Sequence, residues 1–230
     1  SQSIYNVKEN QLYKYRIYTK DGMLKPEFDF EQLISELKTK WDIEVGDYEL
    51  EDGSLVFECD DNLLSVALME APIPDGEAEY FAEANYMWPE AVETTKKHQA
   101  HLVVLTLNRN GNSFEAAAIF SMLVSSCLNQ KSVLGIYTSG TVFQPKFYDE
   151  VAALMKKGDV PVPIWVYVGL GRTEEGNAGY TYGMDAFGKM EMEILDSNHS
   201  LQEIQSFLYY VIEYVILYFV MRIVTRKRPN

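Results

Sequence analysis

The sequence is poor in the residues that build disulfides, metal centres and hydrolytic sites. Its 230 residues include two cysteines and three histidines. Cys59 lies in a strand-like pattern and Cys127 in an apolar helix-like one, so both are expected to be thiols of a reducing cytoplasm rather than a disulfide framework. His98 and His101 flank the end of a predicted helix and the next strand, where their side chains should diverge instead of binding zinc. We therefore expect no metal and no cofactor.

Several local signatures are missing as well. No lysine–serine pair follows the glycine-containing turn at residues 137–143, and Ser139 lacks the G-x-S-x-G frame of a nucleophile elbow. The first residues show no basic segment followed by an apolar run, so no signal peptide is expected. No tandem repeat, low-complexity tract or linker interrupts the chain.

Basic residues are scarce relative to acidic ones. Twenty lysines and arginines face 34 aspartates and glutamates, a formal net charge of −14. Such a field repels nucleic-acid phosphates and anionic lipid, and it attracts a basic protein. Solubility alone is the alternative explanation of an acidic composition.

One long apolar run, residues 207–224, precedes the basic end "TRKRPN". Glu213 falls inside the run, where a carboxylate would oppose membrane insertion. The Tyr, Val and Ile content suits a buried helix that leads into a strand. We therefore do not expect the protein to bind a membrane. A membrane-tethered accessory protein is kept as a third hypothesis.

Hydrophobic periodicity organises the first half of the chain. A strand is predicted over 12–19, and a helix with Asp29 as N-cap and Gln32 in capping-box position follows it. Two strands meet at the turn 60–62, Pro89 begins a helix that runs to about His98, and residues 101–107 form a central strand. The resulting order β-α-β-β-α-β is typical of ferredoxin-like sheets.

The second half repeats helices and strands. Asn112 with Glu115, and later Ser200 with Glu203, are predicted to open helices as capping boxes. Pro145 begins a helix that Gly158 ends, with Phe147, Val151 and Leu154 facing inward. A strand over 163–171 and a hairpin loop over 172–179 complete the pattern. We predict an α/β (α+β) fold, a mixed sheet with helices packed on it. It forms one compact domain of residues 1–230, with pseudo-halves 12–107 and 108–214 as the alternative division.

Four segments carry a resemblance to a known family. They are "LMEAPIPDGEAE", "NYMWPEAVE", "GIYTSGTVFQPKFYDE" and "GLGRTEEGNAGYTYGMDAFGKMEMEILDS". In this order they resemble the bacterial domain-of-unknown-function family 4261, from about residue 28 to about residue 214. The resemblance implies a cytoplasmic bacterial protein and no established activity. Residues 215–230 are an atypical tail, because the family pattern has an acidic segment after "VIEY".

The densest candidate site is "YTYGMDAFGKMEMEI", residues 180–194. One interpretation is a tight connection shaped by Gly183 and Gly188 that leads into an amphipathic strand. On that strand Lys189, Glu191 and Glu193 would share one face, with Met190, Met192 and Ile194 on the other. The functional interpretation is a carboxylate pair with Lys189 and Tyr182 beside it in a cleft, suited to acid–base work or to a divalent cation.

Two further segments contain candidate binding residues. Thr138, Ser139 and Gly140 lie in a turn that either binds an anion through backbone N–H groups or is purely structural. Trp88 either staples a helix to the core or anchors a partner protein. An acidic loop could face a basic partner or simply be solvated. The partner-binding candidates are Trp88, Glu90, Asp75 and Glu77.

Two functional hypotheses precede the membrane-tethered one. The first is a non-enzymatic acidic domain that holds a basic partner, in the manner of an immunity protein against a toxin. The second is an enzyme acting on a small, cationic metabolite at strand ends. Its site would gather Thr138, Ser139, Tyr182, Lys189, Glu191 and Glu193. The sequence sets no substrate, partner identity or oligomeric state.

Overall fold

The computed structural model describes the backbone of residues 11–19, 28–138 and 140–226, and the side chains of 28–138, 140–195 and 198–218. The chain divides into two compact units, Ser1–Ala152 and Ala153–Asn230. The expected organisation as one domain stays a prediction.

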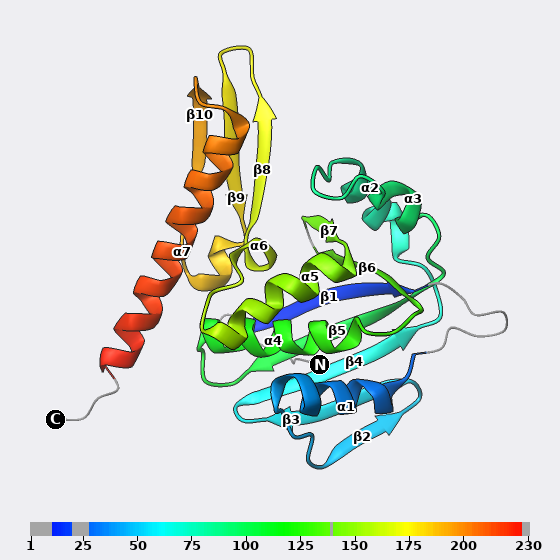
Figure 1. Cartoon of the computed structure of the whole chain (residues 1–230). Helices are drawn as coiled ribbons and strands as arrows, with labels where there is room; N and C mark the ends of the chain where they lie inside the picture. The colour runs from blue at the N-terminus through cyan, green and yellow to red at the C-terminus, as the bar shows by residue number, and fades with distance from the viewer. Residues whose placement is uncertain (1–10, 20–27, 139, 227–230) are drawn as a thin grey trace, which may run out of the picture. The chain divides into compact units, whose positions relative to one another are not determined.

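The first unit is built on a seven-stranded sheet (Figure 1). Its strands are β1 (Gln11–Thr19), β2 (Tyr48–Glu51), β3 (Ser54–Cys59), β4 (Asn62–Met69), β5 (Ala100–Asn108), β6 (Val133–Thr138) and β7 (Thr141–Phe143). Their order is β2-β3-β4-β5-β1-β6-β7, so the apolar run predicted as a central strand, β5, does lie at the centre. The α+β class is confirmed. Every pairing among the described strands is antiparallel, which corrects the expectation of a mixed sheet.

The expected ferredoxin-like order is also corrected. Three strands rather than two follow the first helix, because β2 and β3 form an additional hairpin. Strand β1 pairs with β5 and β6, and β4 pairs with β5. The signal for β2 was the Asp52–Gly53 turn, whose φ angles of 47° and 73° are the left-handed conformations that a two-residue hairpin requires.

Helices cover the sheet on both faces. Helices α1 (Phe30–Trp41), α4 (Ser113–Cys127) and α5 (Pro145–Ala152) lie on one face (Figure 1). The short 3-10 turn Pro74–Gly76 leads into α2 (Glu77–Glu83), and α3 (Ala91–Thr95) follows, two residues after Pro89. On β6, the side chains of Ile136 and Tyr137 point to opposite faces. Because the ring of Phe143, the partner of Ile136, packs on Tyr148 of α5, Tyr137 faces α2 and α3 instead.

Local capping explains where the helices begin. The Asp29 carboxylate accepts a hydrogen bond from the Gln32 N–H at 2.9 Å, and the Asn112 side chain accepts one from the Glu115 N–H at 3.3 Å. Both predicted N-caps are confirmed. In a full capping box the Gln32 side chain would also accept a hydrogen bond from the Asp29 N–H. Here the Gln130 side chain accepts that bond instead.

A polar tie joins three helices of the first unit. The Asp149 carboxylate on α5 accepts hydrogen bonds from Ser125 on α4, at 2.6 Å, and from the Lys40 ammonium of α1. On α5 the fully buried residues are Tyr148 and Ala152. The inward face predicted from Phe147, Val151 and Leu154 is half-buried, so the face that enters the core is rotated by about one residue.

The second unit packs one long helix on a three-stranded antiparallel sheet. After the 3-10 turn Ala153–Lys157, its elements are α6 (Val162–Trp165), β8 (Tyr167–Arg172), β9 (Asn177–Tyr182), the 3-10 turn Met184–Phe187, β10 (Glu193–Ser197) and α7 (Leu201–Arg226), with strand order β10-β9-β8. The predicted hairpin loop is confirmed between β8 and β9. The strand expected over 163–171 begins only at Tyr167, because the preceding residues form α6.

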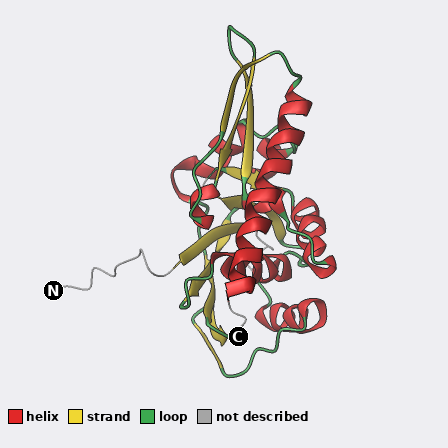
Figure 2. Ribbon diagram, turned by 90° about the vertical axis from the view of Figure 1, so that its left-hand side faces the viewer, coloured by secondary structure: helices red, strands yellow, loops and turns green. Residues whose placement is uncertain are grey.

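Helix α7 runs along this sheet (Figures 1 and 2). It buries a stripe at spacing four, Ile204, Leu208, Ile212 and Ile216. At Gly179 of β9 the helix comes so close that an added Cβ would lie 2.6 Å from Ile204. The predicted capping box is confirmed, since Glu203 accepts from the Ser200 N–H at 2.8 Å and Ser200 Oγ accepts from the Glu203 N–H at 3.2 Å.

The expected transition from helix to strand after residue 207 is wrong, because α7 continues as one helix to Arg226. Within the described ranges, no helix combines the length and the apolar character needed to cross a membrane.

Candidate functional site

Glu191 is the residue on which the Gly-aromatic segment depends. Its carboxylate accepts hydrogen bonds from the Gly183 N–H at 2.8 Å, the Met184 N–H at 2.9 Å and the Thr181 hydroxyl at 2.7 Å. The first two are free donors at the start of the 3-10 turn Met184–Phe187, the position where a carboxylate stabilises a helical end. These three bonds make Glu191 a structural residue. To act in the candidate catalytic pair, its carboxylate would have to give up these bonds.

Two glycines frame that turn. Gly183 has φ 114° and Gly188 has φ 65°, and residues with a side chain rarely adopt either conformation. A Cβ on Gly183 would lie 3.0 Å from the Trp165 carbonyl oxygen, whereas one on Gly188 would meet nothing within 4 Å. The glycines therefore return the chain from β9 to β10, as the structural interpretation of the segment predicts.

The other charged candidates separate from Glu191. Strand β10 begins only at Glu193, so residues 189–192 do not form the amphipathic strand that was expected, and Met190 is 87% exposed instead of facing the core. Glu191 bonds Thr181, which is 2% exposed, while the neighbouring tyrosines of β9 point to the opposite face. Glu193 pairs with Tyr180 and belongs to that opposite face. The two carboxylates are therefore not a facing pair, and Lys189 is half-buried just before them.

A row of tyrosines lies on the open face of the three-stranded sheet. Tyr180 and Tyr182 of β9 are 48% and 52% exposed, and Tyr167 of β8 is the cross-strand partner of Tyr182. The Tyr167 and Tyr180 rings meet edge to face, with centroids 6.3 Å apart. Tyr182, a catalytic candidate in the sequence, is thus part of an aromatic surface.

The candidate anion turn lies in the first unit. The Thr138 hydroxyl donates to the Thr141 carbonyl at 3.3 Å, across the β6–β7 turn that contains Gly140. Ser139 lies outside the described residues. The candidates Thr138 and Tyr182 belong to different units, so the convergence required by the enzyme hypothesis stays a prediction.

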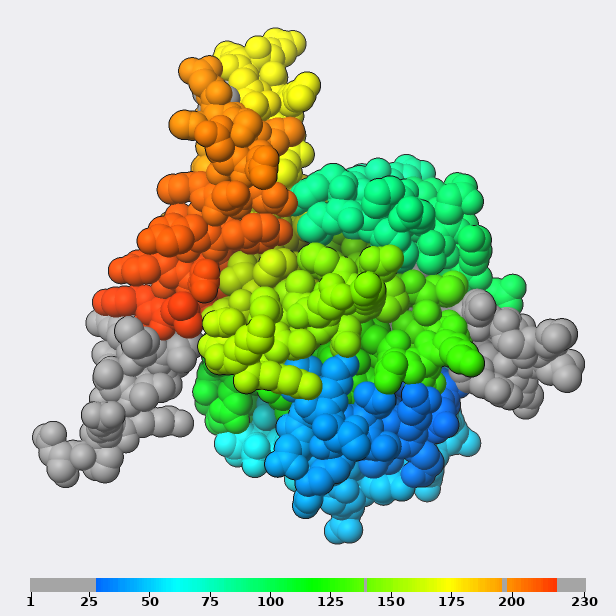
Figure 3. Space-filling view, viewed as in Figure 1, coloured from blue at the N-terminus to red at the C-terminus, as the bar shows by residue number. Residues whose placement is uncertain are grey.

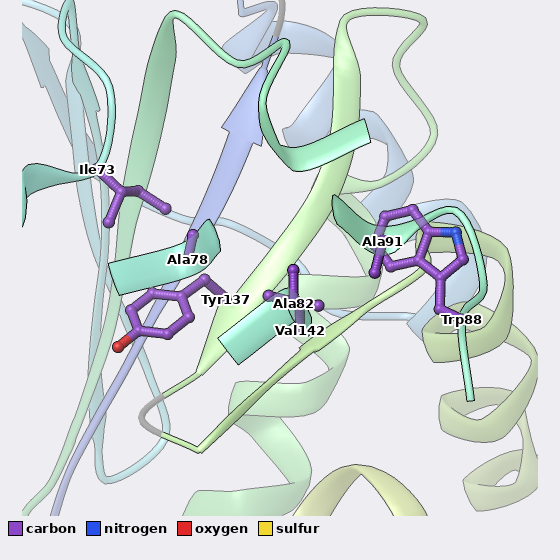
Figure 4. Close-up of a cluster of buried hydrophobic side chains, with 7 residues drawn as sticks. All are labelled: Ile73, Ala78, Ala82, Trp88, Ala91, Tyr137 and Val142. Atoms are coloured by element: carbon purple, nitrogen blue, oxygen red, sulfur yellow. The ribbon is translucent and has the colours of Figure 1, made fainter. Parts of the chain in front are cut away.

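Trp88 belongs to the core beneath α2 and α3. It is 6% exposed and packs in a cluster with Ile73, Ala78, Ala82, Ala91, Tyr137 and Val142 (Figure 4). It is therefore a core residue rather than an exposed partner anchor. Figure 4 shows this cluster joining α2 and α3 to the β6–β7 hairpin, which gives the surface above it a rigid support.

Exposed acidic and aromatic side chains lie over that cluster, on residues 70–97 (turquoise in Figure 3). Tyr80 is 69% and Tyr86 43% exposed. The predicted partner-binding acids Asp75, Glu77 and Glu90 are all exposed, and Glu77 also accepts a 3.2 Å hydrogen bond from the Tyr137 hydroxyl.

The two neighbouring histidines are structural. His98 Nε2 accepts from the Ile73 N–H at 2.9 Å, and its Nδ1 lies 2.5 Å from the Thr95 carbonyl oxygen. His101 Nδ1 lies 2.8 Å from the Ala71 carbonyl oxygen. Both rings thus bond the backbone of residues 71–73, and the divergence expected from the sequence stays a prediction. Among the residues whose positions are described, no three His, Cys, Asp or Glu side chains gather as metal ligands do.

The strongest acidic surface was missed in the sequence. Residues 42–61 contain nine aspartates and glutamates and no lysine or arginine, and all nine are exposed. They lie before, within and after the β2–β3 hairpin, and β2 is an edge strand in which every residue is exposed. Two cations from outside the run pair with it. Lys38 hydrogen-bonds Asp42 at 2.8 Å and Glu44 at 2.7 Å, and it lowers the pKa of the Asp42 carboxyl. Arg109 hydrogen-bonds Glu58 at 2.7 Å. The unbroken run of one charge sign was the available signal.

The charge is divided unequally between the units. By sequence, residues 1–152 contain 25 acidic and 12 basic residues, a net charge of −13, whereas residues 153–230 contain nine and eight, a net charge of −1. Almost all of the chain's net charge therefore belongs to the unit with the acidic hairpin and the α2–α3 surface.

Comparison with known proteins gives one match. No curated protein and no solved structure matches the chain. The model of a family described as a domain of unknown function, DUF4261, matches residues 180–219. This segment holds the Gly-aromatic turn, β10 and most of α7. The predicted resemblance to this family is thus confirmed over residues 180–219, where the chain carries the pattern of a domain whose function is not known, and its extension back to about residue 28 stays a prediction.

Proposed function

We propose that this protein is a non-enzymatic domain that binds a basic partner protein through the first unit. The observation that carries the proposal is the charge distribution. A net charge of −13 belongs to residues 1–152, and the run 42–61, which contains the β2–β3 hairpin, has nine exposed carboxylates and no base of its own. Three of the nine pair with cations from outside the run, Lys38 and Arg109, and the others have no cationic partner in the described residues. A surface of one sign speeds association with an oppositely charged partner and discriminates against others.

The hairpin also offers shape for recognition. Strand β2 ends the sheet, so none of the described strands pairs with its outer backbone groups. Along it Tyr48 and Leu50, 41% and 39% exposed, alternate with Glu49 and Glu51. Apolar and acidic side chains thus alternate along an open edge. Charged edge strands also protect sheets from aggregation, and solubility explains part of this pattern. The second acidic surface, over α2 and α3, adds exposed Tyr80 and Tyr86, residue types that dominate protein interfaces.

The enzyme hypothesis receives less support. Glu191 is held by three hydrogen bonds to the segment that it stabilises, and Glu193 lies on the opposite face of the sheet. Cys127 is buried and Cys59 half-buried, both as free thiols, which suits a cytoplasmic location for the proposed binding.

The test is co-purification with the full chain from the native host, in low and high salt. We expect a basic protein that is retained at about 50 mM salt and released at about 300 mM, because exposed charges are screened over that range. The triple variant Asp47→Asn, Glu49→Gln, Glu51→Gln should lose it. The matched control, Asp159→Asn, Glu174→Gln, Glu175→Gln, removes the same charge from exposed positions of the second unit and should retain it.

Two outcomes would contradict the proposal. One is that no protein co-purifies, and the other is that both triple variants lose the partner equally, which would reduce the effect to net charge. The finer proposal, an immunity-type role, requires in addition that the captured protein is toxic when expressed alone and harmless when this chain is expressed with it.

A further inference from the structure

The ring of Tyr180 is seated on a glycine. Gly169 of β8 is its cross-strand partner, and a Cβ at Gly169 would lie 2.2 Å from Tyr180 Cζ and 2.3 Å from Cε1. The ring therefore lies directly over the Gly169 backbone, and Tyr167 meets it edge to face. One face of the ring is covered in this way while the side chain stays 48% exposed, so the ring is held in place and still presents π-surface to solvent.

A carboxylate stands beside this ring. Glu193 of β10 is the partner of Tyr180 on its other side, and directly opposite residues have Cβ atoms about 5 Å apart. The Glu193 side chain is exposed, and its carboxylate makes no hydrogen bond or ion pair with any described residue. Glu191, two residues earlier, is fully engaged with the turn. The open sheet face thus combines a seated tyrosine, a second exposed ring at Tyr182 and one available negative charge.

We propose that this face binds an arginine side chain of a partner protein. A guanidinium stacks flat on an aromatic ring and, at its edge, donates two parallel hydrogen bonds to a carboxylate. Tyr180 and Glu193, adjacent across the strand pair, supply these two features. A lysine ammonium could pair with the Glu193 carboxylate but would interact more weakly with the Tyr180 ring. An apolar side chain could contact the ring but would make no interaction with Glu193.

A second copy of this chain fits the face poorly. A two-fold contact would bring the same surface of both molecules together, so with Glu193 close to the two-fold axis each Glu193 would approach its own copy. Like charges at such close range are unfavourable. The inference concerns the second unit, whose net charge is only −1, and it does not depend on the acidic surfaces of the first.

The experiment compares two glycine variants of the full chain. Gly169→Ala forces the end of the flexible Tyr180 side chain to move, whereas Gly171→Ala, on the same face of the same strand, meets nothing within 4 Å. Isothermal titration measures the Kd for nona-arginine and for nona-lysine at about 150 mM salt. The preference for nona-arginine should fall about two- to fivefold in Gly169→Ala, the size of an exposed cation–π contact, and stay unchanged in Gly171→Ala. Tyr180→Ala should repeat the loss, and Glu193→Gln should weaken both peptides.

The ratio of the two dissociation constants separates this inference from the proposed function. The triple variant of Asp47, Glu49 and Glu51 tests the acidic surface of the first unit. It should lower the affinity for both peptides and leave the ratio of their two dissociation constants unchanged. An arginine preference that survives Gly169→Ala and Tyr180→Ala would overturn the inference. So would its loss in Tyr80→Ala, which would place the preference on α2. If Tyr180→Ala instead turns a dimer into a monomer by sedimentation, with the ratio unchanged, the face pairs two copies and the inference is wrong.

Discussion

Replacing Gly183 with alanine tests whether the Gly-aromatic segment exists to shape the fold. Gly183 has φ 114° and ψ 1°, outside the conformations that alanine adopts readily. The new Cβ would also lie 3.0 Å from the Trp165 carbonyl oxygen, a backbone atom that cannot move away cheaply. Gly188, at φ 65° and ψ 32°, has the same sign of φ but open space around its Cα.

The magnitudes follow from this difference. A residue forced into a sparsely populated backbone region costs about 1–3 kcal/mol, and the contact with Trp165 puts Gly183→Ala near the upper end. Gly188→Ala needs only a left-handed alanine, about 1 kcal/mol. In a chain of this size each kcal/mol lowers Tm by about 2–4 °C, so the expected losses are about 6–12 °C and about 2–4 °C.

Thermal unfolding followed by circular dichroism gives the answer. Gly171→Ala is the control, because Gly171 lacks a positive φ and has open space, and its Tm should stay within about 2 °C of the parent chain. Gly188→Asn should recover part of the Gly188→Ala loss, since asparagine tolerates the left-handed region. If Gly183→Ala melts like Gly171→Ala, the argument that this segment is built for folding is refuted.

Three further predictions concern stability. Glu191→Ala leaves two backbone N–H groups and the Thr181 hydroxyl without their acceptor, so urea denaturation should show a loss of about 1–2 kcal/mol, with partial recovery in Glu191→Gln. Gly179→Ala wedges β9 away from α7 and should cost about 1–3 kcal/mol in the same assay, against no loss in Gly171→Ala. Burial raises the pKa of Cys127, so above about pH 8.5 the unfolded chain releases a thiol proton that the folded chain keeps. The free energy of unfolding should therefore fall about 1.4 kcal/mol per pH unit faster than in Cys127→Ala, and equal slopes would contradict the assignment.

Local side-chain chemistry made much of the secondary structure predictable. The caps at Asp29, Asn112 and Ser200 depend on residues within four positions of each other, and all three begin helices in the structure. The central strand β5 was marked by a continuous apolar run, as expected for a strand covered on both sides by neighbours. Signals of this kind are independent of the rest of the fold.

Nonlocal features were not predictable in the same way. No pattern within β1 shows that it pairs with β5, some ninety residues away, or that the pairing is antiparallel. Strand β2 has no buried residue, so it lacks the alternation that predicts strands. Beyond residue 207, the β-branched and aromatic content suggested a strand, but packing of the stripe from Ile204 to Ile216 determines a helix.

The role of Glu191 shows why the candidate site was only half predictable. Alternation placed Glu191 with Lys189 and Glu193, on the assumption that a strand had already begun at Lys189. The 3-10 turn between Gly183 and Gly188 delays the strand to Glu193 and brings the Glu191 carboxylate back to the amides of the turn. Residue types and glycine positions were readable from the sequence, whereas the point at which β10 begins depends on tertiary packing.

In the segment matched by the family model, some polar residues have structural roles and others do not. Glu191 holds the turn, and Glu203 caps α7 through Ser200, so neither carboxylate is available for a ligand. The side chains of Tyr180, Tyr182 and Glu193 form no such hydrogen bond among the described residues, and all three are exposed. Cross-strand aromatic contacts such as Tyr167–Tyr180 stabilise a sheet modestly, and the exposed rings beside the Glu193 carboxylate are the part of this segment on which the proposed arginine binding depends.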